Sequence, residues 1–146
     1  MACEICGIIE ESFYETENFS VVLSFKQAYL GRLLVISKRH VQSLSDLSEE
    51  EWKDFSELVK VLESAIKKAF GTRLFNWGCL MNHAYQSKNP EPHVHWHVRP
   101  RYDKEVEFAG KKFTDPHFGK HYNRERDEKV SDEVQRKIIE EIKKYL

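Results

Sequence analysis

Three histidines alternate with apolar residues in the stretch 93–98, which reads His-Val-His-Trp-His-Val. In a β-strand, successive side chains point to opposite faces, so the three imidazoles share one face and the apolar side chains share the other. The apolar face suits a hydrophobic core. The histidine face does not, because a buried imidazole needs a polar partner. We therefore interpret His93, His95 and His97 as parts of a chemical site.

Two kinds of chemistry fit a row of imidazoles on one strand. Histidines two residues apart can aim both rings at one metal ion. Alternatively, a neutral imidazole nitrogen attacks a phosphoryl group, while a neighbouring histidine binds the phosphate oxygens or supplies a proton. Histidine suits this second role because its ordinary pKa of about 6.5 leaves neutral imidazole available at pH 7. The alternative without chemistry is a solvated edge strand.

A second candidate site lies at the start of the chain, where Cys3 and Cys6 form a Cys-x2-Cys pair. This spacing is typical of metal ligands or of a redox pair, and two cysteines packed under a sheet are a third interpretation. We favour metal, because redox pairs of this kind usually follow a strand. His117 and His121 could complete such a site. Cys79 makes the number of cysteines odd, so a disulfide framework is not expected.

The remaining pattern predicts the elements that position these residues. A long helix begins at the capping box Ser48–Glu51, continues with apolar side chains every three or four residues, and ends at Gly71. Ser131 precedes a last helix with one apolar face. Apolar and β-branched runs predict strands at residues 20–25, 33–36, 74–81 and 93–98. This order predicts an α+β fold with an antiparallel sheet.

The length of 146 residues predicts a single domain. Within residues 101–146, we expect the segment 109–129 to be an irregular, solvated excursion. Within it, we expect the stretch 115–122 to form a loop over the sheet or over a dimer partner, with Phe118 and Tyr122 as anchors.

The composition excludes several classes of protein. The 23 basic and 24 acidic residues give a net charge of −1, so no nucleic-acid partner is expected. No apolar run is long enough to cross a membrane, so no membrane association is expected. The N-terminus lacks the basic and apolar regions of a secretory leader, and we expect a cytoplasmic protein.

The stretch 93–99 resembles the signature of the histidine-triad (HIT) superfamily of nucleotide hydrolases and transferases, and only Arg99 departs from its apolar pattern. The segment 33–40 is similar to the family's strand followed by Pro-Lys-x-His, with Ser37 in place of proline. Asn82 occupies a position where the family places Asn or Gln near the phosphate. The Cys-x2-Cys pair is similar to that of the zinc-carrying branch. The resemblance covers about residues 3–100, and residues 101–146 form an extension.

This resemblance implies a HIT-like antiparallel sheet of about five strands, with one long helix packed on it and a C-terminal helix. It also implies roles for individual residues. His95 matches the nucleophile that becomes nucleotidylated, His97 the histidine that contacts the phosphate or bridging oxygen, and Asn82 a phosphate-binding side chain. The implied ligands of one structural zinc ion per chain are Cys3, Cys6, His40 and His93. No catalytic metal is expected.

Departures from the family pattern bear on the substrate. Asn89 and Pro90 replace residues that help to hold the phosphate, and Ser24 aligns with a residue that binds ribose. The family's frequent Gly-His before the second strand is Gly31-Arg32 here. Arg99 and Arg101 follow the histidines, where they are either solvated strand-end residues or contacts for additional phosphates.

The resulting hypothesis is an enzyme that acts at the α-phosphate of a nucleoside phosphate derivative through a nucleotidyl-histidine. Its substrate is a dinucleoside polyphosphate, a nucleotide ester or a phosphoramidate. One alternative is a nucleotide-binding interaction protein with little turnover, motivated by Ser24, Asn89 and Pro90. Another is a zinc-dependent hydrolase that uses the three histidines as ligands. The resemblance also implies a homodimer, for which Trp52 and Phe55 on the long helix offer apolar surface.

Overall fold

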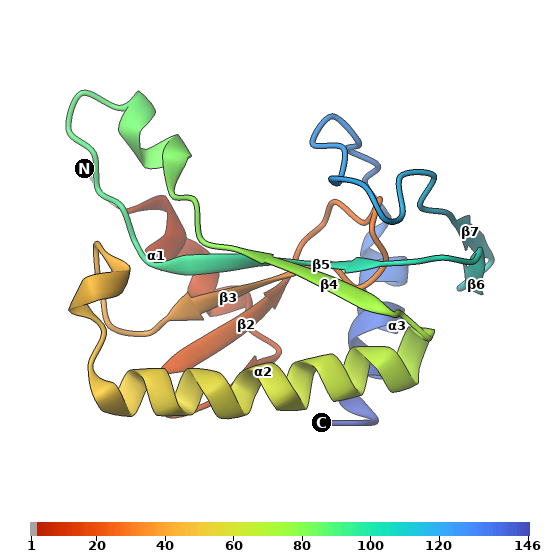
Figure 1. The fold of residues 1–146 in the computed structure, drawn as a ribbon, viewed down its shortest axis with the longest axis horizontal. Helices are drawn as coiled ribbons and strands as arrows, with labels where there is room; N and C mark the ends of the chain where they lie inside the picture. Colours follow the sequence, from red (N-terminus) through yellow and green to blue (C-terminus); the bar gives the residue numbers. More distant parts are fainter. Residues whose placement is uncertain (1–2) are drawn as a thin grey trace.

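A computed structural model describes residues 3–146 (Figure 1). The sheet-forming and helical elements follow one another along the chain as α1 (Glu4–Ile8), η1 (Ile9–Glu11), β1 (Tyr14–Glu15), β2 (Phe19–Leu23), β3 (Leu33–Ser37), η2 (Leu44–Asp46), α2 (Glu49–Phe70), β4 (Leu74–Gly78), η3 (Asn82–Gln86), β5 (His95–Arg101), β6 (Val106–Phe108), β7 (Lys111–Phe113) and α3 (Asp132–Lys143).

The main sheet has five antiparallel strands in the order β1-β2-β3-β5-β4. The predicted α+β architecture is therefore confirmed. The histidine strand β5 lies between β3 and β4, with Leu34 opposite His97 and Gly78 also opposite His97. A strand with hydrogen-bonded neighbours on both sides has little freedom to shift. The backbone that carries the histidines is consequently held on both edges.

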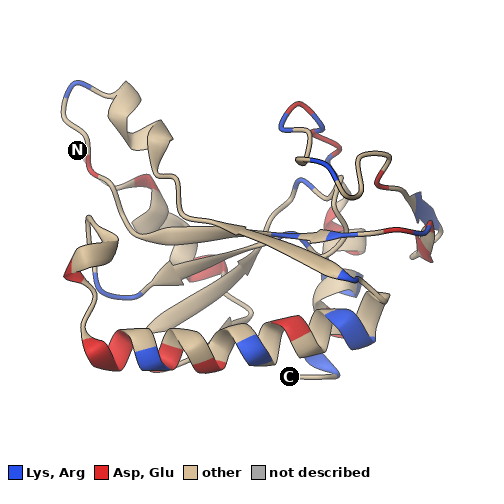
Figure 2. Cartoon of the chain, viewed as in Figure 1, with Lys and Arg blue, Asp and Glu red and all other residues tan. Residues whose placement is uncertain are grey.

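The long helix α2 lies along one face of the sheet (Figure 1) and follows the predicted limits. Ser48 and Glu51 form the capping box, and Gly71 ends the helix in a left-handed conformation at φ 73°, where glycine carries no Cβ penalty. Acidic residues occupy the first turn and lysines the last (Figure 2), which complements the helix dipole.

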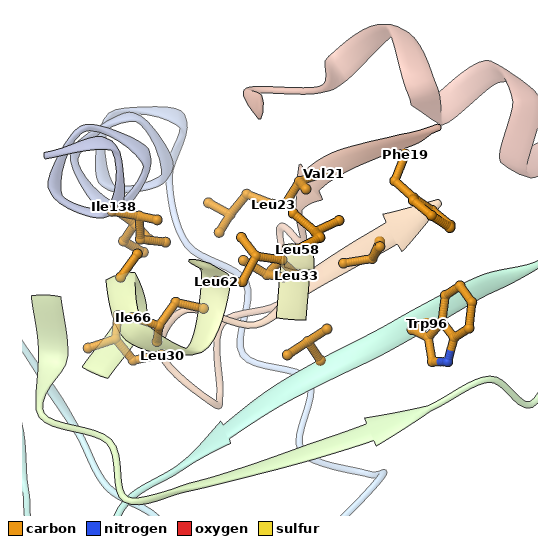
Figure 3. Close-up of a cluster of buried hydrophobic side chains, with 14 of the residues drawn as sticks. Phe19, Val21, Leu23, Leu30, Leu33, Leu58, Leu62, Ile66, Trp96 and Ile138 are labelled. Atoms are coloured by element: carbon orange, nitrogen blue, oxygen red, sulfur yellow. The ribbon is translucent and has the colours of Figure 1, made fainter. Parts of the chain in front are cut away.

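The apolar face of β5 packs on this helix (Figure 3). Trp96 stacks on Phe55 with ring centroids 4.0 Å apart. It also meets Phe19 edge-on. Val94 and Val98 are fully buried in the same core. Ile138 of α3 joins this core near the end of α2 (Figure 3). The expected division of the strand into an apolar face and a histidine face is therefore correct.

Residues 109–129 differ in part from the irregular, solvated excursion that the sequence predicts. They include β7 of the hairpin β6–β7 and a loop over the sheet, where the side chain of Asp115 is 1% exposed. Arg101, also 1% exposed, donates to both carboxylate oxygens of Asp115, at 2.6 and 3.2 Å. Arg101 further donates to the carbonyls of His117 and Lys120. A buried, satisfied ion pair thus attaches the loop to β5, and Arg101 is not a solvated strand-end residue.

The N-terminal segment holds elements that its sequence pattern did not predict. The five residues of α1 have no buried side chain, and β1 is a pair of residues, so neither produces a readable hydrophobic period.

The predicted strand 74–81 ends at Gly78, because Met81 adopts a left-handed conformation at φ 55° and turns the chain into η3. Among residues 3–146, no helix has the length and apolar character needed to cross a membrane.

We predict that Asp115→Asn destabilises the fold by about 3 kcal/mol, because removing one partner leaves the other charge buried and unpaired. Asp103→Asn is the matched control, since Asp103 pairs with Arg73, which is 68% exposed, and such surface pairs contribute little. Urea denaturation of the three proteins measures the difference. Equal unfolding midpoints for the two variants would contradict a dominant role for the Arg101–Asp115 pair.

Candidate functional site

A cleft with a volume of about 790 Å³ lies over the histidine face of the sheet. Its floor is formed by side chains of β3 and β5, and its walls come from α1, from η3 and from the loop after β7. His93, His95 and His97 all line it. Because Trp96 and its apolar neighbours pack on α2, the alternation of the strand directs the three imidazoles into the cleft on the opposite face.

His95 is held by a backbone carbonyl. Its Nδ1 lies 2.7 Å from the carbonyl oxygen of His93, and a carbonyl only accepts, so Nδ1 carries the proton. The other ring nitrogen, Nε2, therefore has a free lone pair. Burial lowers the pKa of His95, which favours the neutral ring. The side chain is 9% exposed and lines the cleft with this unprotonated nitrogen.

His97 has the complementary arrangement. Its Nδ1 lies 3.5 Å from Nη2 of Arg32, which only donates, so Nδ1 accepts and the proton resides on Nε2. Burial lowers the pKa of His97 to about 3, assisted by the charges of His95, Arg32, Arg99 and Arg124. At pH 7 this imidazole is neutral. It therefore offers an N–H hydrogen-bond donor beside the lone pair of His95, at a ring-centroid distance of 5.1 Å.

The side chain of His93 points away from this pair into a cluster with Cys3, Cys6 and His40, whose ligand atoms all lie within 4.8 Å of one another. The Sγ atoms of Cys3 and Cys6 lie 3.4 and 3.3 Å from Nδ1 of His93, and Sγ of Cys6 lies 3.4 Å from Nδ1 of His40. Two ligands of a tetrahedral zinc ion, one sulfur and one nitrogen, are separated by about 3.5 Å. The four residues therefore fit a metal site of Cys2His2 composition.

A second backbone carbonyl, that of Ser37, orients the ring of His93 towards the cysteines. Its Nε2 lies 2.7 Å from the carbonyl oxygen of Ser37 and donates to it, which leaves Nδ1 unprotonated and directed at the sulfur atoms. The hydroxyl of Ser37 donates to the carbonyl of Val94, so Ser37 ties β3 to the start of the histidine segment. His93 therefore carries its proton on Nε2, whereas His95 carries its proton on Nδ1.

The alternative metal sites are not formed. His117 and His121 are absent from the cysteine cluster of the described chain, because the loop that carries them is attached to Arg101. His93 is grouped with the cysteines and not with His95 and His97. The interpretation of the three histidines as ligands of one metal ion is therefore wrong.

The other predicted substrate contacts divide into two groups. Asn82, Asn89 and Arg99 line the cleft, the first two from its exposed wall. Ser24 does not line it in the part of the chain described. Its hydroxyl accepts the backbone N–H of Lys26 at 3.2 Å, directly after β2 has ended, so Ser24 is oriented into a turn. The contact of Ser24 with ribose stays a prediction.

Several residues of the cleft were missed by the sequence argument. Arg32 lines it, and the only signal was its place in the Gly31-Arg32 pair before β3. Tyr122 and Arg124 also line it, and both come from the extension. Nothing in the sequence around Arg124 indicated a site, because a loop returning over the sheet is a property of the tertiary structure.

The profile of the HIT domain matches residues 8–104, about two thirds of the chain. The chain belongs to the HIT domain family. It is 31% identical over 97 residues to an asymmetrical bis(5'-nucleosyl)-tetraphosphatase of Schizosaccharomyces pombe, covering 66% of this chain and 51% of that protein. It is 27% identical over 101 residues to a galactose-1-phosphate uridylyltransferase of Thermotoga maritima, covering 66% of this chain and 32% of that protein. The matches thus span about a third to a half of these relatives.

Among solved structures, this HIT protein is similar to a zinc-bound histidine triad family protein of Mycobacterium smegmatis. The TM-score is 0.64 at 21% identity, over 98% of this chain and 94% of that one. A similarity of this kind concerns the fold, and it extends beyond the matched domain into the C-terminal residues.

Proposed function

We propose that this HIT protein is a nucleotide hydrolase or nucleotidyltransferase that acts at the α-phosphate of a nucleoside phosphate derivative through a nucleotidyl-histidine on His95. The observation that carries the proposal is the pairing of a free Nε2 lone pair on His95 with an N–H donor on His97 in one cleft. The tetraphosphatase and uridylyltransferase names of its relatives also support it.

In the first step, Nε2 of His95 attacks the α-phosphorus and the bond from phosphorus to the leaving-group oxygen breaks. Nδ1 keeps its proton, so the nucleotidylated ring becomes a cation next to the carbonyl of His93, which accepts that proton's hydrogen bond. The N–H of His97 and the side-chain amides of Asn82 and Asn89 donate to phosphate or bridging oxygens, where negative charge develops.

In the second step, a water molecule, or another acceptor in a transferase, attacks the phosphorus and the bond to Nε2 breaks. The ring returns to the neutral form, the nucleotide carries the new oxygen, and one proton goes to solvent. The cycle needs no change of tautomer on His95. Two easier displacements thus replace one difficult displacement.

We predict that His95→Asn lowers turnover on the order of 10³-fold or more, because the covalent path is removed. Nucleotide binding and the unfolding midpoint should change little. His121→Asn, on an exposed part of the loop, is the matched control. Intact mass after rapid quenching should show one nucleotidyl group on the wild type and none on the variant.

The competing function is that of a nucleotide-binding interaction protein with little turnover. It predicts tight nucleotide binding, no adduct and no difference in rate between the wild type and His95→Asn. Near-wild-type turnover by His95→Asn would reject the covalent mechanism outright.

We further propose that Cys3, Cys6, His40 and His93 hold one structural zinc ion, which ties the N-terminus to the histidine strand. A closed set of four protein ligands leaves no position for a substrate or water. The ion would close a loop of about ninety residues and contribute a few kcal/mol to stability in a chain-entropy picture. It would also keep the His93 ring away from the phosphate.

We predict about one zinc ion per chain by elemental analysis. A strong chelator, or the double change Cys3→Ser and Cys6→Ser, should lower the melting temperature because the cross-link is lost. Cys79→Ser is the matched control, since Cys79 lies outside the cluster. A double variant that melts with the wild type would reject a structural metal.

We also propose a homodimer that forms through the free edge of β4, the last strand in the sheet order. Leu74 on this strand is 40% exposed, and Phe75 and Trp77 are partly exposed. Trp52, 41% exposed, adds apolar surface on α2, whereas Phe55 stacks on Trp96 and serves the core.

Light scattering should accordingly give about twice the chain mass of 17.3 kDa at micromolar concentration. Leu74→Lys should shift the population towards the monomer by placing a charge in the interface. Lys60→Ala, a change on the exposed side of α2, should leave the mass unaltered. A wild-type mass of one chain would reject the dimer.

A further inference from the structure

His95 and His97 contact hydrogen-bonding partners of opposite kind. Nδ1 of His95 lies 2.7 Å from the carbonyl oxygen of His93, which only accepts. Nδ1 of His97 lies 3.5 Å from Nη2 of Arg32, which only donates. A neutral imidazole carries a single N–H, so the two partners place it on different nitrogens of the two rings. An unprotonated Nε2 on His95 therefore neighbours a protonated Nε2 on His97.

This difference between the rings matters for attack on a phosphate. The nucleophile needs a lone pair, whereas the phosphate oxygens, on which negative charge develops, need a donor. An acceptor at position 32 would hold the proton of His97 on Nδ1, as the carbonyl of His93 does for His95. Both rings would then direct lone pairs at the phosphate. The donor character of Arg32 consequently decides what His97 offers.

Arg32 reaches His97 across the pairing of β3 with β5. Leu34 lies opposite His97 in this ladder, and Arg32 precedes Leu34 by two residues, so its side chain lies on the same face. Diagonal neighbours of this kind are about 7–8 Å apart, a distance that a long side chain can span. Both Arg32 and His97 line the cleft.

The backbone of Arg32 is fixed by a buried amide. Gln27 is fully buried, and its Nε2 donates to the carbonyls of Ser24 and Arg32 at 2.6 and 2.8 Å. Its Oε1 accepts the backbone N–H of Gly31 at 2.8 Å. The backbone N–H of Arg32 donates to the carbonyl of Tyr29 at 2.9 Å. The turn before β3 is thus closed around the residue that contacts His97.

The guanidinium group of Arg32 has little else to stabilise it. Its Nε is buried without a hydrogen-bond partner, and no carboxylate pairs with it among residues 3–146. Burial, followed by the charge of Arg99, lowers the pKa of Arg32 to about 10, so the group stays protonated at pH 7. Arg101 shows the arrangement expected of a structural arginine, since Asp115 neutralises it. The unpaired Arg32 burdens the fold, as residues retained for function do.

The next arginine of the strand does not take this place. The Cζ of Arg99 lies 4.0 Å from the ring centroid of Tyr122, and its contact is with that ring. Within the part of the chain that the structure describes, the hydrogen-bond partner of Nδ1 of His97 is Arg32.

We infer that Arg32 is a positioning residue, which fixes His97 as the tautomer with its proton on Nε2 and directs that N–H at the phosphate. The inference rests on the proposed function for its catalytic consequence. Arg32 acts through His97 and needs no contact with the substrate. Hydrogen bonds of catalytic groups are often long in the free enzyme and tighten in the complex, which accords with the 3.5 Å contact.

No proton leaves His97 in this scheme. When the bond from the α-phosphorus to the leaving oxygen breaks, the electron pair stays on that oxygen and Nε2 of His97 donates a hydrogen bond to the developing charge. A donor at Nδ1 polarises the ring less towards proton release than an acceptor would. Burial, with the nearby charges of His95, Arg32, Arg99 and Arg124, lowers the pKa of His97 to about 3, so the ring remains neutral throughout.

The first test observes the tautomer in the free protein. Heteronuclear NMR at pH 7, with nitrogen-labelled histidine, distinguishes a protonated ring nitrogen from an unprotonated one, and the spectrum of His97→Gln assigns the signals. We expect Nδ1 of His97 to be unprotonated in the wild type and in Arg32→Lys, because lysine also only donates. Arg32→Glu supplies an acceptor and should place a proton on Nδ1. Arg32→Met supplies no donor and should give a mixture of tautomers.

The control is Arg136→Met, which removes one positive charge from an exposed position on α3 and should leave the tautomer of His97 unchanged. Thermal unfolding shows which variants are folded, and the methionine variant decides the question if the glutamate variant is not. An Nδ1 that stays unprotonated in every folded variant without a donor at position 32 overturns the inference.

The second test asks whether Arg32 acts through His97. We expect Arg32→Met to lower kcat for the p-nitrophenyl ester of AMP about tenfold, while KM changes less than about threefold. In a His97→Gln background the same change should cost less than about twofold, because the group that it positions is gone. A tenfold loss in that background overturns the inference, as does a loss that appears in KM alone.

The two tests separate failure of the inference from failure of the proposed function. If the wild type forms no nucleotidyl adduct and turns over no nucleotide, the proposed function fails. The NMR result still decides whether Arg32 sets the tautomer of His97, since it requires neither substrate nor turnover.

Discussion

Two backbone carbonyls determine what the histidine strand can do. The carbonyl of Ser37 accepts a hydrogen bond from Nε2 of His93, and the carbonyl of His93 accepts one from Nδ1 of His95. One ring thereby directs an unprotonated nitrogen at the cysteines, and the next directs one into the cleft. The two arrangements are linked, since His93, whose side chain lies in the cluster with the cysteines, also supplies the carbonyl that orients the ring of His95.

The C-terminal extension is part of the same site. Arg101 and Asp115 satisfy each other beneath the loop, and this attachment lets Tyr122 and Arg124 form a wall of the cleft. Along one face of the histidine segment and β5, the chain therefore passes from the Cys2His2 cluster through the imidazoles of His95 and His97 to Arg99 and then to Arg101. Within residues 3–146, Arg99 has no carboxylate partner, whereas Arg101 pairs with Asp115. Each position differs in what surrounds it, although the strand geometry that presents them is the same.

Strong local periodicity explains which elements were predictable. The helix from Glu49 to Phe70 carries its own caps and a continuous apolar stripe, so its limits follow from local rules. The alternation at 93–98 likewise requires opposite faces. By contrast, α1 buries none of its side chains, and the segment after Gly78 turns at Met81 through a backbone conformation that methionine rarely adopts. Such features carry no periodic signal.

The amino-acid sequence by itself determined the family, the order of the main elements, the histidine face of β5 and the four residues that meet in the Cys2His2 cluster, because these depend on residue type, spacing and resemblance. The tertiary structure decided the tautomers of His93 and His95, the turn that Ser24 occupies, and the presence of Arg32, Arg99 and Arg124 in one cleft. The physical reason is distance along the chain. A hydrogen bond from His93 to Ser37 or a wall contributed by Arg124 joins residues dozens of positions apart, and only the pairing of β3 with β5 and the return of the extension bring them together.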